Sequence, residues 1–502
     1  MAELAAVVVG AGFSGLCAGI ELRRAGIEDF VILEQAAGLG GTWRDNSYPG
    51  AACDIPSHLY SYSFEPNPRW SRAFGGQPEI LAYLEHCADK YRLRSHLRFG
   101  ARVVRAVYDD ARAVWTVETQ AGARYVARAL LFGNGALHVP AIPDLPGLST
   151  FAGAAFHSAR WDHARDLTGR RVAVIGTGAS TIQIAPAIAP RVAQLHVFQR
   201  TPPWIVPKAD RPVAARERWI LEHVPGAHWL RRTGLYWLME SRVLAFAFAP
   251  RLGHVVERLA RRNLRRAVPD PELRRRLTPD YRLGCKRVLI SNDYYATLAR
   301  PNVELVTDAI AAVEPAGIRT ADGQLREVDT IIFGTGFRVT DYMAAIEVIG
   351  RGGQELNDAW RAEVRSYLGI NVSGFPNLFL LMGPNTGLGH NSMIFMIEAQ
   401  VRYAVRAIRA MRRHALAAID VRPEVERAFR AEMSRRLAGT VWTSGCRSWY
   451  MAPDGDVLLW PSFTFDYWRR TRRVRLSAYD TRALAHSSRE LAESLPDARA
   501  AI

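Results

Sequence analysis

A glycine-rich turn close to the N-terminus constrains the fold of this chain more than any other feature. The apolar run Leu4–Val9 predicts a strand, Gly10–Gly15 (GAGFSG) predicts a tight turn, and the Ala- and Leu-rich residues after it predict a helix to about Ala25. A second apolar run, Phe30–Leu33, predicts another strand. Strand, turn, helix and strand in this order are typical of a unit that binds a dinucleotide.

Each glycine of the turn has a physical task. Gly10 permits the sharp turn, Gly12 lets the backbone approach a pyrophosphate, and Gly15 lets the helix pack closely on the strand. Glu34 follows Gly15 by 19 residues, which suits a carboxylate that accepts hydrogen bonds from a ribose diol. We therefore predict a dinucleotide site here, rather than a glycine turn in some other α/β unit.

Length and composition limit the class of protein. A chain of 502 residues exceeds what one hydrophobic core usually supports, so we expect two or three domains. The N-terminus lacks the basic region of a secretory signal, and no uncharged apolar segment reaches about 18 residues, so we expect a cytoplasmic protein without a membrane span. The cysteines form neither a C-x-x-C pair nor a metal-ligand spacing, which indicates a reduced compartment. They are Cys17, Cys53, Cys87, Cys285 and Cys446.

The charge is strongly positive. A formal net charge of +16 suits anionic ligands or an acidic surface. Only three of the 65 basic residues are lysines, namely Lys90, Lys208 and Lys286. No nucleic-acid-binding motif is present, so we expect no nucleic-acid partner and interpret most of the surplus as an ordinary solvated surface.

A second glycine turn of the same kind follows the strand predicted at Arg171–Ile175. It reads Gly176-Thr177-Gly178-Ala179-Ser180-Thr181 and precedes a helix and a strand at Leu195–Phe198. Thr181 replaces the third glycine. We expect this replacement to loosen the packing of helix on strand and to leave the phosphate-facing backbone intact.

The residues after the second strand of each unit distinguish the two nucleotides. The first unit carries Glu34, whereas the second carries Gln199-Arg200-Thr201. A carboxylate favours a free ribose 2′-hydroxyl and repels a phosphate, but an arginine and a hydroxyl favour a 2′-phosphate. We therefore assign FAD to the first site and NADPH to the second.

Further strands are predicted along the chain. Arg102–Val107 and Val114–Thr119 alternate, while Ala129–Phe132 and Asp329–Phe333 are short buried strands that end in small residues. Prolines from Pro140 onward mark a linker between domains.

Residues 211–279 are rich in Arg, Leu and Trp at helical spacing and predict a helical insertion. We expect one of its faces to pack on the substrate cleft; weak contact with an anionic membrane surface is the alternative. The last 25 residues predict a helix or a frayed tail. The domains that we expect are an FAD domain at 1–148 and 375–502, with a C-terminal loop, an NADPH domain at 149–210 and 280–374, and the insertion at 211–279.

Two further motifs identify a family. The loop Gly41-Thr42-Trp43, with Tyr48-Pro49-Gly50 and Asp54 after it, places aromatic, hydroxyl and acidic groups on a flexible backbone. Phe151-x-Gly153-x-x-x-His157-x-x-x-Trp161-Asp162 matches a longer fingerprint at every fixed position. In both motifs the chain resembles the Baeyer–Villiger monooxygenases, class B flavoprotein monooxygenases that use FAD and NADPH. We interpret His157 itself as a packed structural histidine that couples the two nucleotide domains.

The resemblance implies a fold and a reaction. The fold would be two doubly wound, Rossmann-like α/β domains, each discontinuous in sequence, with the helical insertion. The reaction would use NADPH and O2 to insert oxygen next to a ketone carbonyl, through a peroxyflavin, and give an ester or lactone. The alternative is a related flavin monooxygenase that acts on amine or sulfide heteroatoms. The partners would be a small-molecule ketone and O2, and the chain would be a monomer or a homodimer.

The resemblance also implies roles for single residues. Arg287 would be the catalytic cation over the flavin, Asp54 would hold it, and Lys286 would lie beside the NADPH 2′-phosphate. A helix that begins near Asn391 or Ser392 would direct its N-terminus at the flavin pyrimidine. Trp449, in the C-terminal loop, would contact NADP. Other expected FAD contacts are Phe13, Ser14, Gln35, Gly41, Thr42, Trp43, Tyr60, Val104 and Met393.

Overall fold

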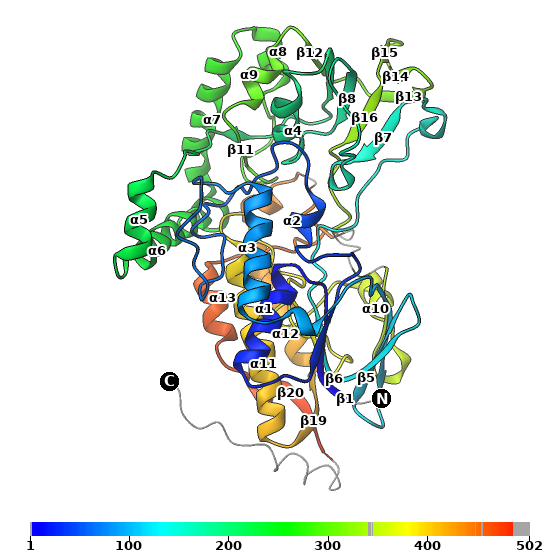
Figure 1. Ribbon diagram of the computed structural model, residues 1–502, viewed down its shortest axis with the longest axis vertical. Coiled ribbons are helices and arrows are strands. Elements are labelled where there is room, and N and C mark those ends of the chain that lie inside the picture. The colour runs from blue at the N-terminus through cyan, green and yellow to red at the C-terminus, as the bar shows by residue number, and fades with distance from the viewer. Residues whose placement is uncertain (1–2, 340–342, 344, 447, 453–454, 485–502) are drawn as a thin grey trace.

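The computed structural model describes residues 3–339, 343, 345–446, 448–452 and 455–484, and these form two units that each surround a largely parallel sheet. In Figure 1 the unit drawn mainly in green lies at one end of the long axis, and the blue, yellow and orange unit lies at the other. The predicted mixed α/β class is confirmed.

The larger sheet contains the first glycine turn. Its central strand β1 (Glu3–Val9) pairs in parallel with β2 (Phe30–Leu33) and with β6 (Arg124–Phe132). Helix α1 (Phe13–Arg24) packs against the long helix α11 (Met393–Arg413). The remaining strands of the sheet are β3 (Leu97–Arg98), β4 (Val103–Asp109), β5 (Val114–Thr119), β17 (Glu347–Ile349) and β18 (Leu378–Leu380).

The smaller sheet contains the second glycine turn, and all of its strand pairs are parallel. Its order is β12 (Val303–Val306), β9 (Gln194–Phe198), β8 (Arg171–Ile175), β16 (Thr330–Phe333) and β7 (Ala154–His157). Helix α4 (Thr181–Ile188) follows β8 and contacts α9 (Tyr294–Leu298). An antiparallel meander, β13 (Ile310–Glu314), β14 (Gly317–Thr320) and β15 (Leu325–Glu327), adjoins the sheet.

The sequence suggests that Thr181 loosens the packing of helix on strand in the second unit, but the structure shows close packing there. Its side chain is fully buried. A Cβ atom placed on Gly334 would lie only 2.1 Å from the Thr181 Oγ1 atom. The space that the third glycine normally provides is therefore supplied by Gly334 on the neighbouring strand connection.

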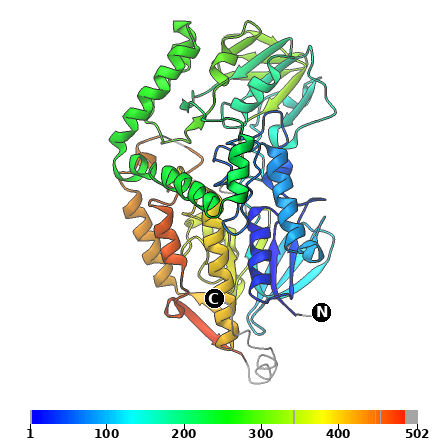
Figure 2. The same cartoon turned by 60° about the vertical axis from the view of Figure 1, so that its left-hand side comes forward.

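The insertion is helical, as predicted. It consists of α5 (Ala215–His223), α6 (Ala227–Glu240), α7 (Gly253–Ala267) and α8 (Pro271–Arg276). In Figure 2 these green helices come forward over the rest of the molecule. The inner side of α6 packs on the larger unit, because the Arg232 guanidinium donates to the carbonyl oxygens of His58 and Ser61, both at 3.0 Å, and the Tyr236 ring stacks on Phe395 at 5.2 Å.

The chain returns to the larger sheet earlier than predicted. Residues 280–374 are expected to belong to the NADPH domain, yet β17 pairs with β4 of the larger sheet. Further helices of that unit include α3 (Gln77–Lys90), α10 (Leu356–Ala362), α12 (Pro423–Leu437) and α13 (Thr464–Thr471).

Part of the C-terminal segment forms a strand. Although a helix or a tail is expected over the last 25 residues, β20 (Tyr479–Ala483) pairs with β19 (Leu416–Val421). Residues 485–502 lie outside the described residues. Within the described part of the chain, no helix combines the length and the hydropathy needed to cross a bilayer.

Candidate active site

The first glycine turn has the close packing that a dinucleotide turn needs. Gly10 has a φ of +94°, which a side chain would disfavour. A Cβ atom on Gly15 would lie 1.7 Å from the Gly10 carbonyl oxygen, and one on Gly12 would lie 3.7 Å from the Cα atom of Gly41. No side chain caps the N-terminus of α1. The first backbone amides of the helix therefore lack a side-chain partner, and amides of this kind are what bind the pyrophosphate of FAD.

Glu34 is held against this turn. Its carboxylate is buried and accepts hydrogen bonds from the backbone amides of Ala11, at 2.8 Å, and Ala36, at 2.9 Å. Arg44 forms an ion pair with it at 3.0 Å. The carboxylate thus lies beside the turn in a fixed orientation, and its contact with a ribose stays a prediction. Gln35, next to it, is exposed.

The loop after the turn joins the two units. It contains a short helix, α2 (Thr42–Asp45). The Trp43 indole donates to the Tyr60 hydroxyl at 3.1 Å. The Tyr48 hydroxyl donates to the Gln183 side chain on α4 at 3.0 Å, and burial raises the pKa of Tyr48 to about 12. The loop that carries the predicted FAD contacts Trp43 and Tyr60 at its two ends is therefore attached to the first helix of the second unit.

Asp54 and Arg287 form an ion pair, although 233 positions separate them in sequence. Both guanidinium contacts end on the same carboxylate oxygen, with Nε at 2.9 Å and Nη2 at 2.5 Å from Oδ2. The Arg287 side chain is 30% exposed and the Asp54 side chain is 26% exposed. The Asp54 carboxylate raises the pKa of Arg287 above its ordinary value, so the cation is fixed and permanent.

Two further residues lie in the field of this pair, and neither is in the predicted set. Burial raises the pKa of Tyr450, while Arg287 opposes that shift. Among the described residues its hydroxyl has no hydrogen-bond partner. Desolvation lowers the pKa of Arg242 on the insertion, and Asp54 opposes it. The sequence does contain one signal for Arg242, because its charge interrupts the apolar part of the insertion.

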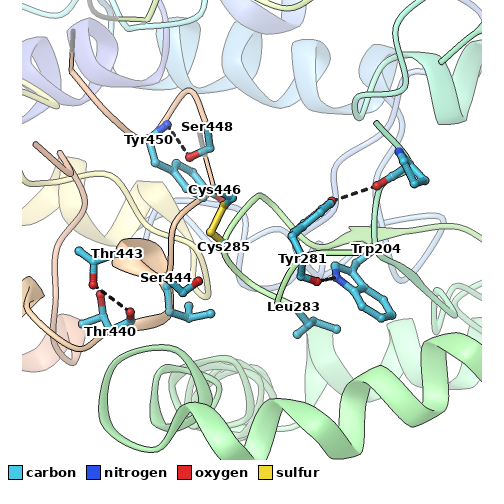
Figure 3. The surroundings of a disulfide bond; sticks show 12 residues. Trp204, Tyr281, Leu283, Cys285, Thr440, Thr443, Ser444, Cys446, Ser448 and Tyr450 are labelled. Atoms are coloured by element: carbon cyan, nitrogen blue, oxygen red, sulfur yellow. Dashed lines mark hydrogen bonds between the residues drawn. A yellow bond between two sulfur atoms is a disulfide. The ribbon is translucent and has the colours of Figure 1, made fainter. Parts of the chain in front are cut away.

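A disulfide bond joins the Arg287 segment to the C-terminal loop. Cys285 and Cys446 are bonded across 161 positions, with their Cα atoms 6.2 Å apart (Figure 3). The interpretation of the cysteines as those of a reduced compartment does not account for this bond, because no local spacing connects such distant residues. The bond ties Arg287, two residues beyond Cys285, to the loop that carries Tyr450.

Two cations meet beside the second glycine turn. Burial lowers the pKa of Lys286, and the positive charge of Arg200 lowers it further. Neither residue forms a salt bridge with another described residue. The Thr177 hydroxyl donates to the Thr201 carbonyl oxygen at 3.0 Å and holds the end of β9 against the turn. Two like charges at this place fit an anion such as the 2′-phosphate of NADPH.

The helix expected near Asn391 begins at Met393 as α11, with the Ser392 hydroxyl capping the amide of Ile394 at 3.3 Å. Glu240, at the end of α6, is fully buried and accepts a hydrogen bond from the Asn391 amide at 2.6 Å. The insertion therefore fixes the N-terminus of α11, where partial positive charge would face the flavin.

His157 has the structural role that the sequence suggests. It is 2% exposed, its Nε2 atom lies 2.9 Å from the Gly336 carbonyl oxygen, and its Nδ1 accepts from the Ala159 amide at 3.1 Å. Burial lowers its pKa, which favours the neutral ring. Both ring nitrogens are thus occupied within the protein.

Trp449 and Val104 are two further residues for which the sequence predicts a cofactor contact. Trp449 is 45% exposed and its ring packs on that of Tyr450 at 4.4 Å between centroids. Val104 lies half-buried in β4. Both stay predictions as cofactor contacts.

Known proteins resemble this chain over almost its whole length. Residues 7–224 match the family model described as pyridine nucleotide-disulphide oxidoreductase. A Baeyer–Villiger monooxygenase of Pseudomonas aeruginosa is 47% identical, over 97% of this chain and 94% of its own length. Another of Streptomyces coelicolor is 48% identical, over 94% and 91%. The crystal structure of OTEMO in complex with FAD and NADP superposes with a TM-score of 0.87 at 28% identity, over 95% and 99%.

Proposed function

Because the chain belongs to the Baeyer–Villiger monooxygenase family, we propose that its Arg287–Asp54 pair is the centre at which a ketone is converted to an ester or lactone. The protein is an FAD-containing monooxygenase that uses NADPH and O2. One oxygen atom enters the bond between the carbonyl carbon and its neighbour. The other leaves as water, with NADPH and a proton as the reductant. Bound FAD supplies the oxygen-activating chemistry.

The larger unit binds FAD and the smaller unit binds NADPH in this proposal. The support is the tight first turn with its buried Glu34, against the second turn with Arg200 and Lys286 close together. A carboxylate beside the first nucleotide excludes a 2′-phosphate, whereas two cations beside the second attract one.

Arg287 stabilises negative charge at the reacting oxygen atoms. Attack on a carbonyl requires an anionic oxygen nucleophile, and the charge then moves to the former carbonyl oxygen. A guanidinium keeps its charge at every working pH, and preorganised charge of this kind is the main electrostatic contribution to such reactions. Asp54 fixes the guanidinium from one side through the contacts of Nε and Nη2 and leaves Nη1 for the reacting atoms.

The ion pair is the observation that carries the ketone reaction over heteroatom oxygenation. In heteroatom oxygenation the amine or sulfide is itself the nucleophile, so the oxygen donor is protonated and electrophilic, and no fixed cation is needed to keep it anionic. A buried salt bridge is costly to keep unless it has a task, because both charges lose hydration. The partly buried pair between Asp54 and Arg287 has such a task in the ketone reaction.

Kinetics of an Arg287→Ala variant test this function. We expect NADPH still to be consumed, with electrons released as hydrogen peroxide, while ester formation falls by about 100-fold or more, as for the loss of one preorganised group at an oxyanion. Arg300→Ala, which removes an exposed arginine of the same segment, is the matched control. Products from a mixed ketone and sulfide panel are identified by mass spectrometry. Full ester formation by Arg287→Ala would remove Arg287 from this role.

A further inference from the structure

The outer side of the helical insertion exposes large apolar side chains. On α6, Trp229 is 65% exposed, Leu230 64%, Trp237 53% and Leu238 58%. These residues follow helical spacing, and no charged side chain lies between them on that side of the helix. Arg231 instead pairs with Glu217, and Arg232 donates to the His58–Ser61 segment. Single exposed apolar residues are ordinary, but a row of tryptophan and leucine is not.

The apolar surface continues beyond α6. The Trp237 ring lies 6.1 Å from Phe465, Phe465 lies 5.3 Å from Phe463, and Phe463 stacks on Phe248 at 5.2 Å. We call the whole surface the insertion face. Its exposed members are Trp229, Leu230, Trp237, Leu238, Leu244, Phe248, Leu252, Val255, Leu259, Phe465 and Trp468.

The charges around the insertion face are almost all positive. Residues 223–267 contain nine arginines and only two acidic residues, Glu240 and Glu257. Glu240 is fully buried, and Glu257 accepts a hydrogen bond from the Leu283 amide at 3.1 Å. Along α7, Leu252, Val255 and Leu259 share one side of the helix. The exposed Arg258 and Arg262 flank this side.

We propose that the insertion face docks on an anionic lipid surface. Amphipathic helices with Trp and Leu on one side and Arg on the other lie in the interface of a bilayer, where the aromatic rings sit at headgroup depth and the arginines reach lipid phosphates. An aromatic ring and an arginine are in direct contact at Trp468, because the Arg472 guanidinium lies 4.5 Å from the centroid of its ring. In Figure 1, α5 and α6 stand out at one side of the molecule, and in Figure 2 α7 does so.

Charge argues against a second copy as the occupant. A twofold contact through the insertion face would place the arginine-rich α7 helices of two copies beside each other or near the arginines of the partner's α6–α7 connection. No exposed acidic cluster within residues 223–267 could compensate these charges. An anionic lipid surface supplies the missing negative charge, at a gain of about fivefold in affinity for each arginine near it.

The insertion face lies close to the proposed active site. The inner end of α6 carries Glu240, which holds Asn391 before α11, so one helix separates the insertion face from the proposed flavin-binding helix terminus. An apolar ketone dissolved in the bilayer would thus be concentrated beside the enzyme. The lipid-binding proposal itself does not depend on the identity of the substrate.

Vesicle sedimentation with the FAD-loaded full chain tests the proposal. We expect binding to phosphatidylcholine vesicles that contain phosphatidylglycerol, little binding to phosphatidylcholine alone, and weakening with added salt. Trp229→Ser with Leu230→Ser should lower the affinity by about tenfold or more through lost apolar burial. Arg258→Gln with Arg262→Gln should lower it by about 25-fold. Monooxygenase activity without vesicles should stay at the parent level.

A control with the same chemistry lies elsewhere on the molecule. Phe99→Ser with Arg102→Gln removes an exposed aromatic ring and an exposed arginine from the connection between β3 and β4, and should leave vesicle binding unchanged. Three results would overturn the proposal: no sedimentation with any vesicle, equal binding to both kinds of vesicle, or a dimer in sedimentation velocity that Trp229→Ser with Leu230→Ser converts to a monomer. FAD content and the midpoint of thermal unfolding establish that each variant is folded.

Discussion

At the scale of single residues, Lys286 and Arg200 are two like charges whose proximity costs free energy unless an anion shares them. The lowered pKa of Lys286 records part of this cost, after burial. Lysine is rare in this chain, and at this position it supplies a compact charge that fits beside the guanidinium of Arg200. In our proposal, discrimination between NADPH and NADH therefore rests on a pair of residues rather than on one.

We predict that Lys286→Ala raises the KM for NADPH by about 10- to 100-fold, because a hydrogen bond to a charged group contributes about 1.5–3 kcal/mol. The KM for NADH should change by less than about threefold, since NADH has no 2′-phosphate. Steady-state kinetics with both nucleotides measure this, with Lys90→Ala as the control for loss of a distant lysine. Equal changes for NADPH and NADH would show that Lys286 does not contact the phosphate.

Gly334 and Thr181 form a second pair, because the side chain of Thr181 occupies the space that a side chain at position 334 would need. A Cβ atom on Gly334 would overlap the Thr181 hydroxyl, so we predict that Gly334→Ala lowers the free energy of unfolding by about 1–3 kcal/mol. Thr181→Gly in the same chain should restore part of that loss. Gly178→Ala is the control, because its Cβ atom would lie 3.9 Å from the nearest described atom. Denaturant titration gives the values; a fully additive double variant would contradict the overlap.

At the scale of elements, the disulfide bond fixes the C-terminal loop beside the Arg287–Asp54 pair. Reduction or loss of the bond would free two segments that adjoin Arg287 and Tyr450. We predict that Cys446→Ser lowers the free energy of unfolding by about 2–4 kcal/mol. Calorimetry with and without dithiothreitol measures this. The reductant should lower the unfolding temperature of the parent chain and leave that of Cys446→Ser unchanged, whereas equal responses would mean that the bond is not formed.

Elements with a local signal could be predicted from the sequence. The strand, turn and helix from Glu3 to Arg24 and the helices of 211–279 follow from periodicity and glycine spacing, which act over a few residues. The contact of Asp54 with Arg287 was predicted only through resemblance to a family, since nothing local joins residues 233 positions apart. The pairing of β17 with β4 has no such resemblance behind it, and it was missed.

Some site residues were missed for a related reason. Tyr450 is buried and Trp449 is exposed, yet both are aromatic neighbours in one loop without regular structure. A loop has no periodicity from which the inward residue can be read, so the choice depends on the packing of distant segments. The same holds for Gly334, whose need to be glycine arises from Thr181 on another element.

At the scale of the whole molecule, the chain passes between the two sheets on its way to β7 and again after β16, and these two connections touch each other. The Ala141 amide donates to the Gly336 carbonyl oxygen, and the Arg338 amide donates to that of Val139, both at 2.9 Å. His157, the histidine of the fingerprint, lies 2.9 Å from the same Gly336 oxygen through Nε2. This crossing therefore helps to set the relative placement of the two nucleotide-binding units, together with the Tyr48–Gln183 and Asp54–Arg287 contacts.

We predict that His157→Ala slows the anaerobic reduction of bound FAD by NADPH by about 10- to 100-fold, because transfer between two cofactors is sensitive to displacements of about 1 Å. FAD content should stay at the parent level, since the first glycine turn is distant from the substitution in sequence and belongs to the other sheet. His157→Gln, whose side-chain amide can still donate to Gly336, should recover part of the rate. Stopped-flow absorbance measures the step. A rate equal to the parent's in His157→Ala would mean that the crossing holds its geometry without the ring, and the histidine would then serve packing of the smaller sheet alone.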